Sequence, residues 1–403
     1  MKAYNVAALF ISVALIIFLV IFGLNPDGFR TVLENRESLA EGSEWVEKTY
    51  SIQGLTEYID EHPEFVSLAS MVVGHPDSTL MFRADTPRTM GMTAGVLVSL
   101  AYEDLFFRDA EDPNRKIRWE DTGRYQLPGI NESNHREAAR YGRRNGLIDS
   151  NGELTLDSAL NLMIRYNDPA LFDYLLLNLP EQEMARIYST AGLQHTDVPL
   201  PFSGLYLALA PSIQKGPAEE LLGQWQNSGP AQFRQEVLNQ TDRFVSGTER
   251  DGWLEVLERN RLGLTFMQER DILTLFPKTT AREMAEFLSQ IRSGSLFPNE
   301  VSRNLLNRMR WQLEDASLSR NFTDYGSWYD NRVGLLNGVD FGTSHYTEDT
   351  TVQAVFFDQL HIAVWFHMSS NHMHQDFQQR LIWDPALIET MMKIRQENGT
   401  TEP

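Results

Sequence analysis

Segments with the character of β-strands lie only near the two ends of this chain, and the long stretch between them has a helical pattern. Residues 65–73 are rich in apolar and β-branched side chains, which favours a strand. Residues 75–78, His-Pro-Asp-Ser, are typical of a turn, and residues 79–82 form a second short strand-like segment. The sequence therefore predicts a β-hairpin early in the chain.

Strand character returns only near the C-terminal end. Residues 333–341, 351–358 and 360–368 are three further predicted strands, and residues 377–396 have the pattern of an amphipathic helix. Residues from 91 to about 314 have helical periodicity. A sheet that draws strands from both ends of the chain, with an all-helical lobe inserted between them, accounts for this order. The expected fold class is therefore α/β, more strictly α+β, with two lobes and an antiparallel sheet.

The N-terminus carries a continuous apolar run from Val6 to Leu24, interrupted only by Ser12 and Gly23. As a helix this run would be roughly 28 Å long, close to the ~30 Å hydrocarbon core of a bilayer. No small-residue cleavage site follows it, so we expect an uncleaved transmembrane signal anchor, with a cleaved signal peptide as the alternative. Lys2 favours an orientation with the N-terminus inside. These features predict a single-pass protein of a bacterial inner membrane whose main domain is periplasmic or extracellular.

The expected domain organisation follows from these segments. Residues 1–25 would be the anchor, 26–51 a helical stalk or linker, 52–396 the main domain, and 397–403 a polar tail.

The composition narrows the classes of partner. The chain has 55 acidic and 35 basic residues, for a formal net charge of −20, whereas nucleic-acid binding needs clustered Lys and Arg. Nucleic acid is therefore not an expected partner. The absence of cysteine excludes disulfides, iron–sulfur clusters and thiolate zinc sites. We expect no cofactor.

The segment from Met81 to Glu103 reads MFRADTPRTMGMTAGVLVSLAYE. It resembles the part of the class A β-lactamase-like, penicillin-recognising serine hydrolases that carries their nucleophile, where Ser-x-x-Lys begins a buried helix. In that frame Met92 takes the serine position and Gly95 takes the lysine position.

Two further segments resemble the other catalytic elements of the same family. Met163-Ile164-Arg165-Tyr166 is followed by Asn167-Asp168-Pro169, which matches the Ser-Asp-Asn element with Asn167 in the serine position and Pro169 in the asparagine position. Leu336-Asn337-Gly338 is the best match to Lys-Thr-Gly, and only Gly338 keeps the family residue. The resemblance covers roughly residues 54–396 and implies a two-lobed β-lactamase/transpeptidase-like fold.

The substitutions indicate that the family's chemistry has been lost. A thioether cannot attack a carbonyl, glycine has no amine, and no lysine lies between Lys48 and Lys116 to replace it. Thr93 is a minor candidate nucleophile, and its ordinary interpretation is a hydroxyl bonded to backbone at the start of a helix. We therefore assign no catalytic residue to the chain.

Two functional hypotheses follow. The first is a catalytically degenerate, membrane-anchored protein that uses the old cleft to bind or scaffold a cell-wall component or an envelope protein. Its candidate binding residues are Asn167, Asp168, Asn337 and His345, the last expected near the cleft edge. The alternative is a divergent serine hydrolase that acts on β-lactams or peptide-like amides through non-standard residues.

Other constellations have simpler interpretations. His367, His372 and His374 with Asp376 do not have a standard zinc spacing, so we expect solvated loop histidines and no metal. A literal Ser-x-x-Lys at residues 212–215 lies in a segment flanked by Pro and Gly, outside the family frame, and we do not expect it to be catalytic.

Overall fold

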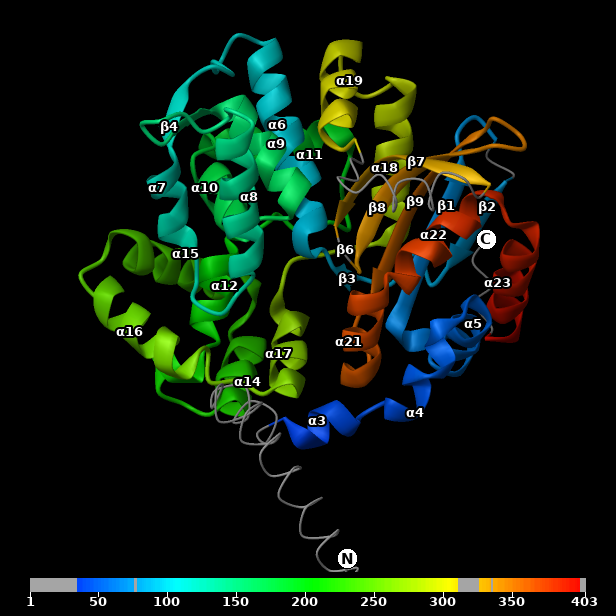
Figure 1. Ribbon diagram of the computed structural model, residues 1–403, viewed down its shortest axis with the longest axis horizontal. Coiled ribbons are helices and arrows are strands. Elements are labelled where there is room, and N and C mark those ends of the chain that lie inside the picture. Colours follow the sequence, from blue (N-terminus) through cyan, green and yellow to red (C-terminus); the bar gives the residue numbers. More distant parts are fainter. Residues whose placement is uncertain (1–34, 76–77, 311–325, 335, 399–403) are drawn as a thin grey trace, which may run out of the picture.

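The computed structural model describes residues 35–75, 78–310, 326–334 and 336–398. They form two lobes, a sheet covered by helices and a lobe made almost wholly of helices (Figure 1). Five strands form the main sheet in the order β2-β1-β9-β8-β7, and every neighbouring pair is antiparallel. Their bounds are Val66–Val72 for β1, Thr79–Phe82 for β2, Ser327–Gly334 for β7, Gly338–Ser344 for β8 and Thr350–Phe357 for β9. Strands from both ends of the chain thus share one sheet, as the sequence predicts.

The helical lobe is inserted between β2 and β7. Its helices and short 3-10 turns are η3 Gly91–Ala94, α6 Gly95–Phe107, α7 Trp119–Thr122, η4 Gly123–Tyr125, α8 Glu132–Arg144, α9 Leu156–Tyr166, α10 Pro169–Leu177, α11 Glu181–Ala191, α12 Phe202–Ala208, α13 Pro211–Gln214, α14 Ala218–Ser228, α15 Pro230–Ser246, α16 Arg250–Asn260, α17 Phe266–Ile272 and η5 Leu273–Leu275. Two strand pairs accompany them, β3 Arg88–Thr89 with β6 Lys278–Thr279 and β4 Lys116–Arg118 with β5 Glu153–Thr155. Thr155 caps α9, since its hydroxyl accepts from the amide of Ser158 in the first turn of the helix.

Both faces of the sheet are covered, so its side chains alternate between two cores. Val352, Ala354 and Phe356 of β9 pack with the helical lobe, whereas Val355 and Phe357 pack on the opposite face. The helices that complete these two layers are α18 Ala281–Ser293 and α19 Asn299–Arg308, and on the opposite side α5 Ile52–Glu61, α21 Ile362–Asn371, α22 Met373–Trp383 and α23 Pro385–Glu397, with η2 Pro63–Phe65 between α5 and β1.

Two predictions near the C-terminal end are wrong. Residues 333–341 are not one strand, because Gly334 ends β7 and Gly338 begins β8. The backbone at Gly334 has φ +95°, and a Cβ there would lie 2.0 Å from the Asn337 carbonyl oxygen, so this turn requires glycine. Residues 360–368 are not a strand but the start of α21.

The error at α21 has a physical cause. Ala363, Val364, His367 and Met368 are buried whereas Trp365 and Phe366 are exposed, which is helical spacing. A short continuous apolar run fits a buried strand and a helix equally well on periodicity alone. The predicted helix 377–396 is likewise divided into α22 and α23, because Asp384 caps a new helix whose first residue is Pro385.

The predicted stalk is folded onto the body where it is described. Residues 35–51 form α3 Arg36–Ala40, α4 Ser43–Val46 and η1 Lys48–Tyr50, and Trp45 is buried in the same core as α5. The predicted anchor at residues 6–24 lies outside the described residues. Among the residues that are described, none of the helices is long and apolar enough to cross a bilayer.

Candidate functional site

A cleft of about 450 Å³ lies between the helical lobe and the sheet lobe, and some of the positions singled out in the sequence line it. Met92, Pro169, Leu336 and Asn337 all line this cleft. The other lining residues are Thr89, Gly91, Gly129, Ile130, Asn131, Phe202, Tyr206, Arg261, Leu262, Phe266, Glu269, Arg270, Leu273, Phe276, Phe357, Asp358, Gln359, Leu360, Ile362, Trp365 and Phe366. Most of these side chains are apolar or aromatic, which is typical of a small-ligand site.

Met92 and Gly95, to which the resemblance assigns the nucleophile and base positions, carry no hydroxyl or amine. Met92 is half-buried in η3, and the Thr93 hydroxyl is fully buried and donates to the Met90 carbonyl at 2.6 Å. Thr93 is therefore the backbone-bonded hydroxyl of the ordinary interpretation. A Cβ built on Gly95 would lie 3.2 Å from Ile164 Cδ1 and 3.5 Å from Met163 Cε. The space that a longer side chain at residue 95 would need is occupied by α9.

The Asn167-Asp168-Pro169 segment holds the two lobes in register. Asn167 has φ +46° at the end of α9, and its Oδ1 accepts from the Gly334 amide of β7 at 3.1 Å. Asp168 is fully buried and caps α10, since its Oδ1 accepts from the amides of Ala170 and Leu171 at 2.9 and 3.2 Å. These contacts are structural, and Pro169 is the residue of the segment that reaches the cleft.

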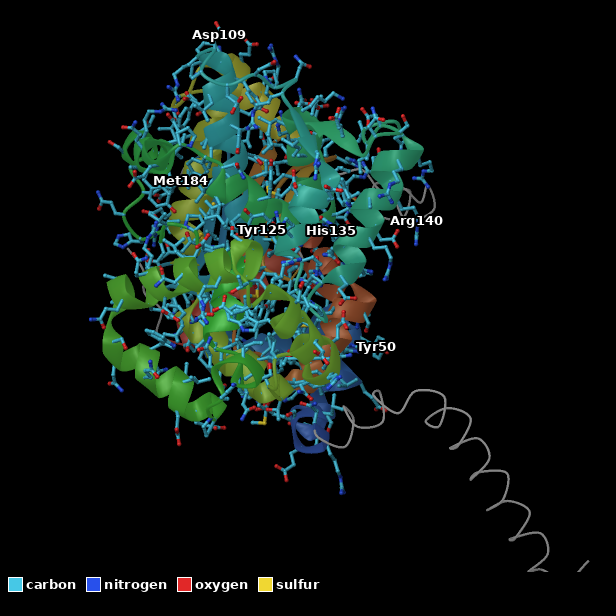
Figure 2. All side chains as sticks on the ribbon, turned by 90° about the vertical axis from the view of Figure 1, so that its left-hand side faces the viewer. Tyr50, Asp109, Tyr125, His135, Arg140 and Met184 are labelled. Atoms are coloured by element: carbon cyan, nitrogen blue, oxygen red, sulfur yellow. The ribbon has the colours of Figure 1, made fainter. Side chains whose placement is uncertain are left out.

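The second oxygen of Asp168 lies 2.8 Å from Nδ1 of His135, whose ring stacks on Trp119 at 4.4 Å. Figure 2 shows His135 on the helical-lobe face. This pair fixes α8 against α10, and His135 does not line the cleft. The carboxylate predicted to bind a ligand is instead used inside the lobe.

The third family element lies in a turn rather than on a strand. The Asn337 amide donates to the Thr89 carbonyl at 2.9 Å, and its Oδ1 accepts from the Phe357 amide at 2.8 Å, so this side chain ties β9 to β3. Among the described residues, the strand residues that line the cleft are Thr89 of β3 and Phe357 of β9. Arg332 is fully buried behind the sheet with Asp340 and Gln378, so it supplies no cation to the cleft.

His345 lies away from the cleft, contrary to expectation. It follows β8, which begins at Gly338 near the cleft and extends seven residues, a distance of roughly 20 Å at ~3.4 Å per residue. The residue is exposed, and its amide donates to the Gly326 carbonyl at 2.8 Å. The prediction of a place at the cleft edge is therefore wrong.

Of the C-terminal histidines, His367 and His374 lie in helices and not in a solvated loop, whereas His372 is exposed between α21 and α22. His367 and His374 are buried, and burial lowers the pKa of His374 to about 3. Nδ1 of His374 lies 3.2 Å from the Met368 carbonyl oxygen. Across the described ranges the structure contains no cluster of three or more metal-type ligands. The Ser212 hydroxyl donates to the Arg261 carbonyl, and neither Ser212 nor Lys215 lines the cleft.

Three charged groups of the cleft that sequence reasoning missed come from α17 and the loop before it, and a fourth, Asp358, follows β9. Glu269 is half-buried, and burial raises its pKa to about 7, a shift that the charge of Arg261 opposes. Arg261 is exposed, and its guanidinium forms no hydrogen bond or ion pair with the residues that the structure describes. Arg270 is held by Glu41 at 2.7 Å. No local motif marks these residues, since their common feature is the cleft itself.

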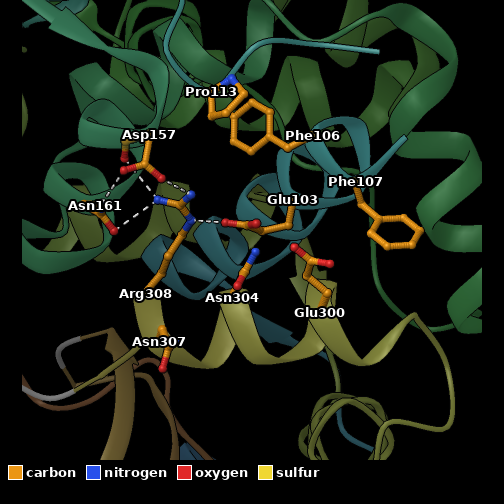
Figure 3. A pocket seen from close by; sticks show the side chains of 10 residues that line it. All are labelled: Glu103, Phe106, Phe107, Pro113, Asp157, Asn161, Glu300, Asn304, Asn307 and Arg308. Atoms are coloured by element: carbon orange, nitrogen blue, oxygen red, sulfur yellow. Dashed lines mark hydrogen bonds and ion pairs between the residues drawn. The ribbon is translucent and has the colours of Figure 1, made fainter. Parts of the chain in front are cut away.

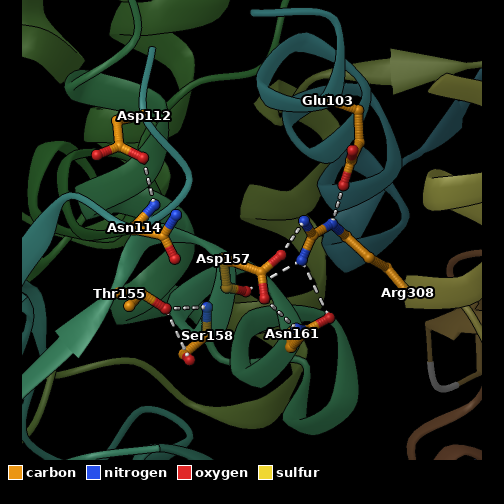
Figure 4. A network of polar contacts seen from close by, with 8 residues as sticks. All are labelled: Glu103, Asp112, Asn114, Thr155, Asp157, Ser158, Asn161 and Arg308. Atoms are coloured by element: carbon orange, nitrogen blue, oxygen red, sulfur yellow. Dashed lines mark hydrogen bonds and ion pairs between the residues drawn. The ribbon is translucent and has the colours of Figure 1, made fainter. Parts of the chain in front are cut away.

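A second cavity of about 450 Å³ lies elsewhere, among α6, α9 and α19 (Figure 3). Arg308 is its central group: it pairs with buried Glu103 and donates to Asp157 Oδ1 at 2.6 Å and to Asn161 Oδ1 at 3.0 Å. Figure 4 shows that these side chains point toward one another. The cavity's charged groups therefore join three helices, and the interlobe cleft is the better candidate site.

No protein-family model matches the sequence, and no curated protein matches it. Solved structures of similar overall path include a β-lactamase from Sphaerobacter thermophilus, the TLA-1 extended-spectrum β-lactamase, and a PBP-A variant in an acyl-enzyme complex with penicillin G. They are 14%, 11% and 11% identical, with TM-scores of 0.45, 0.45 and 0.46. The matches cover 88%, 85% and 81% of this chain and 100%, 98% and 97% of theirs. Scores and identities this low establish neither family membership nor activity.

Proposed function

We propose that this protein is a membrane-anchored, extracytoplasmic relative of the β-lactamase-like serine hydrolases that binds a ligand in its interlobe cleft and does not hydrolyse it. The observation that carries the proposal is the identity of residues 92 and 95, to which the resemblance assigns the nucleophile and the base. Met92 lines the cleft, and the space beyond Gly95 is filled by Ile164.

The physical argument concerns what a serine-type hydrolase needs. Its nucleophile is a hydroxyl activated by an adjacent base within hydrogen-bond reach. Among the described residues that line the cleft, the Thr89 hydroxyl donates to the Leu273 carbonyl at 3.1 Å, and burial raises the pKa of the Tyr206 hydroxyl well above its usual range. Neither is an activated nucleophile.

Retention of the cleft supports a binding role. Its volume of about 450 Å³ lies within the range of ~300–1,000 Å³ found for small-molecule sites. The apolar run at residues 6–24 supports attachment to the bacterial inner membrane, so the ligand or partner would come from the cell envelope.

The proposal is tested by incubating the folded full-length protein with a fluorescent penicillin and measuring intact mass. We expect no covalent adduct at millimolar probe, under conditions in which an active penicillin-binding enzyme is fully labelled. A stable adduct that disappears in a single hydroxyl variant, such as Thr93→Val, would refute the proposal and establish the hydrolase alternative.

A further inference from the structure

The mouth of the cleft has exposed aromatic side chains. Trp365 and Phe366 of α21 are 45% and 38% exposed, and both line the cleft. The ring of Phe366 packs edge-on against Phe266 of α17 across the cleft, with 5.0 Å between ring centroids. Tyr50, 64% exposed, packs on His367 of the same helix. Exposed aromatic rings beside an apolar cavity are suited to a ligand with a long apolar part.

The same end of the cleft is tied to the first described residues of the chain. The Phe266 amide donates to Asn35 Oδ1 at 2.6 Å, and α3 and α4 lie beneath α17 and α21 (Figure 1). The predicted anchor ends at Leu24, so residues 25–34 separate it from Asn35. Ten residues span at most about 36 Å even when fully extended. The mouth is therefore held near the membrane in which the anchor would lie.

The charged side chains of the cleft differ in how far they are exposed to solvent. Arg261, from the loop before α17, is exposed and makes no ion pair with the described residues, whereas Glu269 lies half-buried on the wall. Tyr206 of α12 also faces this region, and Arg270 and Asp358 complete its charged groups. A cation at the rim suits an anionic head group, while the apolar interior suits a chain.

We propose that the cleft binds a single-chain amphiphile with an anionic head group, placing the head at Arg261 and the chain among the aromatic side chains of α12, α17 and α21. This inference rests on the proposed function of the cleft as a binding site, and it names the class of ligand.

The probe for the test is an alkyl sulfonate with a diazirine in its chain, because the sulfonate keeps its charge over the working pH range. The full-length protein is placed in nanodiscs of zwitterionic lipid, irradiated with the probe at pH 8, and digested for peptide mapping. Labelling is normalised to the total probe taken up by the nanodisc. We expect adducts on cleft peptides from α12, α17 and α21, and much weaker labelling by an uncharged alkyl glycoside of the same chain length.

Charge variants test the head-group contact. Arg261→Glu should reduce cleft labelling roughly tenfold, the effect of losing about 1.4 kcal/mol. Arg259→Glu is the matched control, since that arginine is two residues away with 73% of its side chain exposed and pairs with Glu255; it should change labelling less than about twofold. Glu269→Gln should increase labelling at pH 8, because a carboxyl with a pKa of about 7 is ionised there and repels the sulfonate.

Equal labelling by the charged and the uncharged probe would overturn the head-group assignment. An equal decrease of labelling in Arg261→Glu and Arg259→Glu would overturn it as well. The comparison of the two probes uses only the unsubstituted protein, so it does not depend on whether a variant folds. Absence of adducts from the cleft would overturn the inference altogether. The same preparation is treated with fluorescent penicillin. A penicillin adduct refutes the proposed function, whereas its absence together with an unlabelled cleft refutes only the amphiphile.

Discussion

Gly95 lies at a position where the packing leaves little room for a longer side chain. It begins α6 with its Cα directed at α9, where Ile164 and Met163 fill the space that a longer side chain would occupy. Protein interiors are close-packed, so an added side chain must displace a neighbour. The glycine at residue 95 and the position of the Ile164 side chain therefore depend on each other.

We expect Gly95→Lys to lower the free energy of unfolding by about 1–3 kcal/mol through overpacking, as measured by chemical denaturation. Gly95→Ala should be nearly neutral, because the gain of about 1 kcal/mol in helix propensity offsets the tight contact with a flexible side-chain end. In an Ile164→Ala background, Gly95→Lys should lower the free energy of unfolding by about 1 kcal/mol or more less than it does in the unsubstituted protein. Strict additivity of the two substitutions would show that Ile164 does not block residue 95.

The residues that line the cleft were only partly predictable from the sequence. The replaced positions Met92 and Gly95 follow from the family frame. Glu269 and Arg261 carry no sequence signal, because a carboxyl on a short helix and an arginine in a loop are ordinary surface residues until apolar walls surround them.

At the scale of elements, two helices begin with the same four residues in different surroundings. Asp168-Pro169-Ala170-Leu171 begins α10, and Asp384-Pro385-Ala386-Leu387 begins α23. Each aspartate accepts from the amides of the following alanine and leucine, so the local cap is the same. Asp168 is in addition fully buried and bonded to His135.

Substituting each aspartate separates the cap from its surroundings. Asp384→Ala should lower the free energy of unfolding by about 1 kcal/mol, the usual contribution of an N-cap side chain. Asp168→Ala should cost about 2–4 kcal/mol, because it also leaves the imidazole of His135 without its buried partner. Both values come from urea unfolding of the same full-length protein. Equal costs would mean that the His135 contact contributes nothing to stability.

The order of elements was largely predictable from the sequence, because strand and helix periodicities are local. The hairpin of β1 and β2 and the long helical insertion are confirmed. The segment 360–368 was mistaken for a strand, since a nine-residue apolar run has no periodicity that separates the two states. Its burial on one side arises from tertiary contacts, among them those with α3, α4, η1 and α22.

For the whole molecule, Glu41 connects the two walls of the cleft. Its Oε2 accepts from Arg270 of α17 at 2.7 Å and from the Ile362 amide that begins α21 at 3.2 Å, and its carbonyl accepts from the Ala363 amide at 3.1 Å. The segment that follows the predicted anchor thus spans the end of the cleft near α17 and α21.

Glu41→Ala should loosen this connection. Hydrogen exchange at the first amides of α21 and at α17 is expected to rise roughly tenfold, as for a local opening made easier by about 1.4 kcal/mol. The exposed Glu44→Ala is the control and should leave both regions unchanged. If exchange rises only within α3 and α4, the segment packs on the body without joining its lobes.

The sequence by itself determined most of the order of strands and helices, the apolar N-terminal run, and the absence of a hydroxyl and an amine at residues 92 and 95. These properties depend on residue identity and on neighbours within a few positions. The tertiary structure alone decided that Asn167 and Asn337 hold the lobes in register, that His345 lies far from the cleft, and that Arg261, Glu269 and Trp365 share one cavity. The physical reason is that side chains far apart in sequence form such a cavity. Its low dielectric and the grouping of its charged side chains arise only when both lobes enclose it.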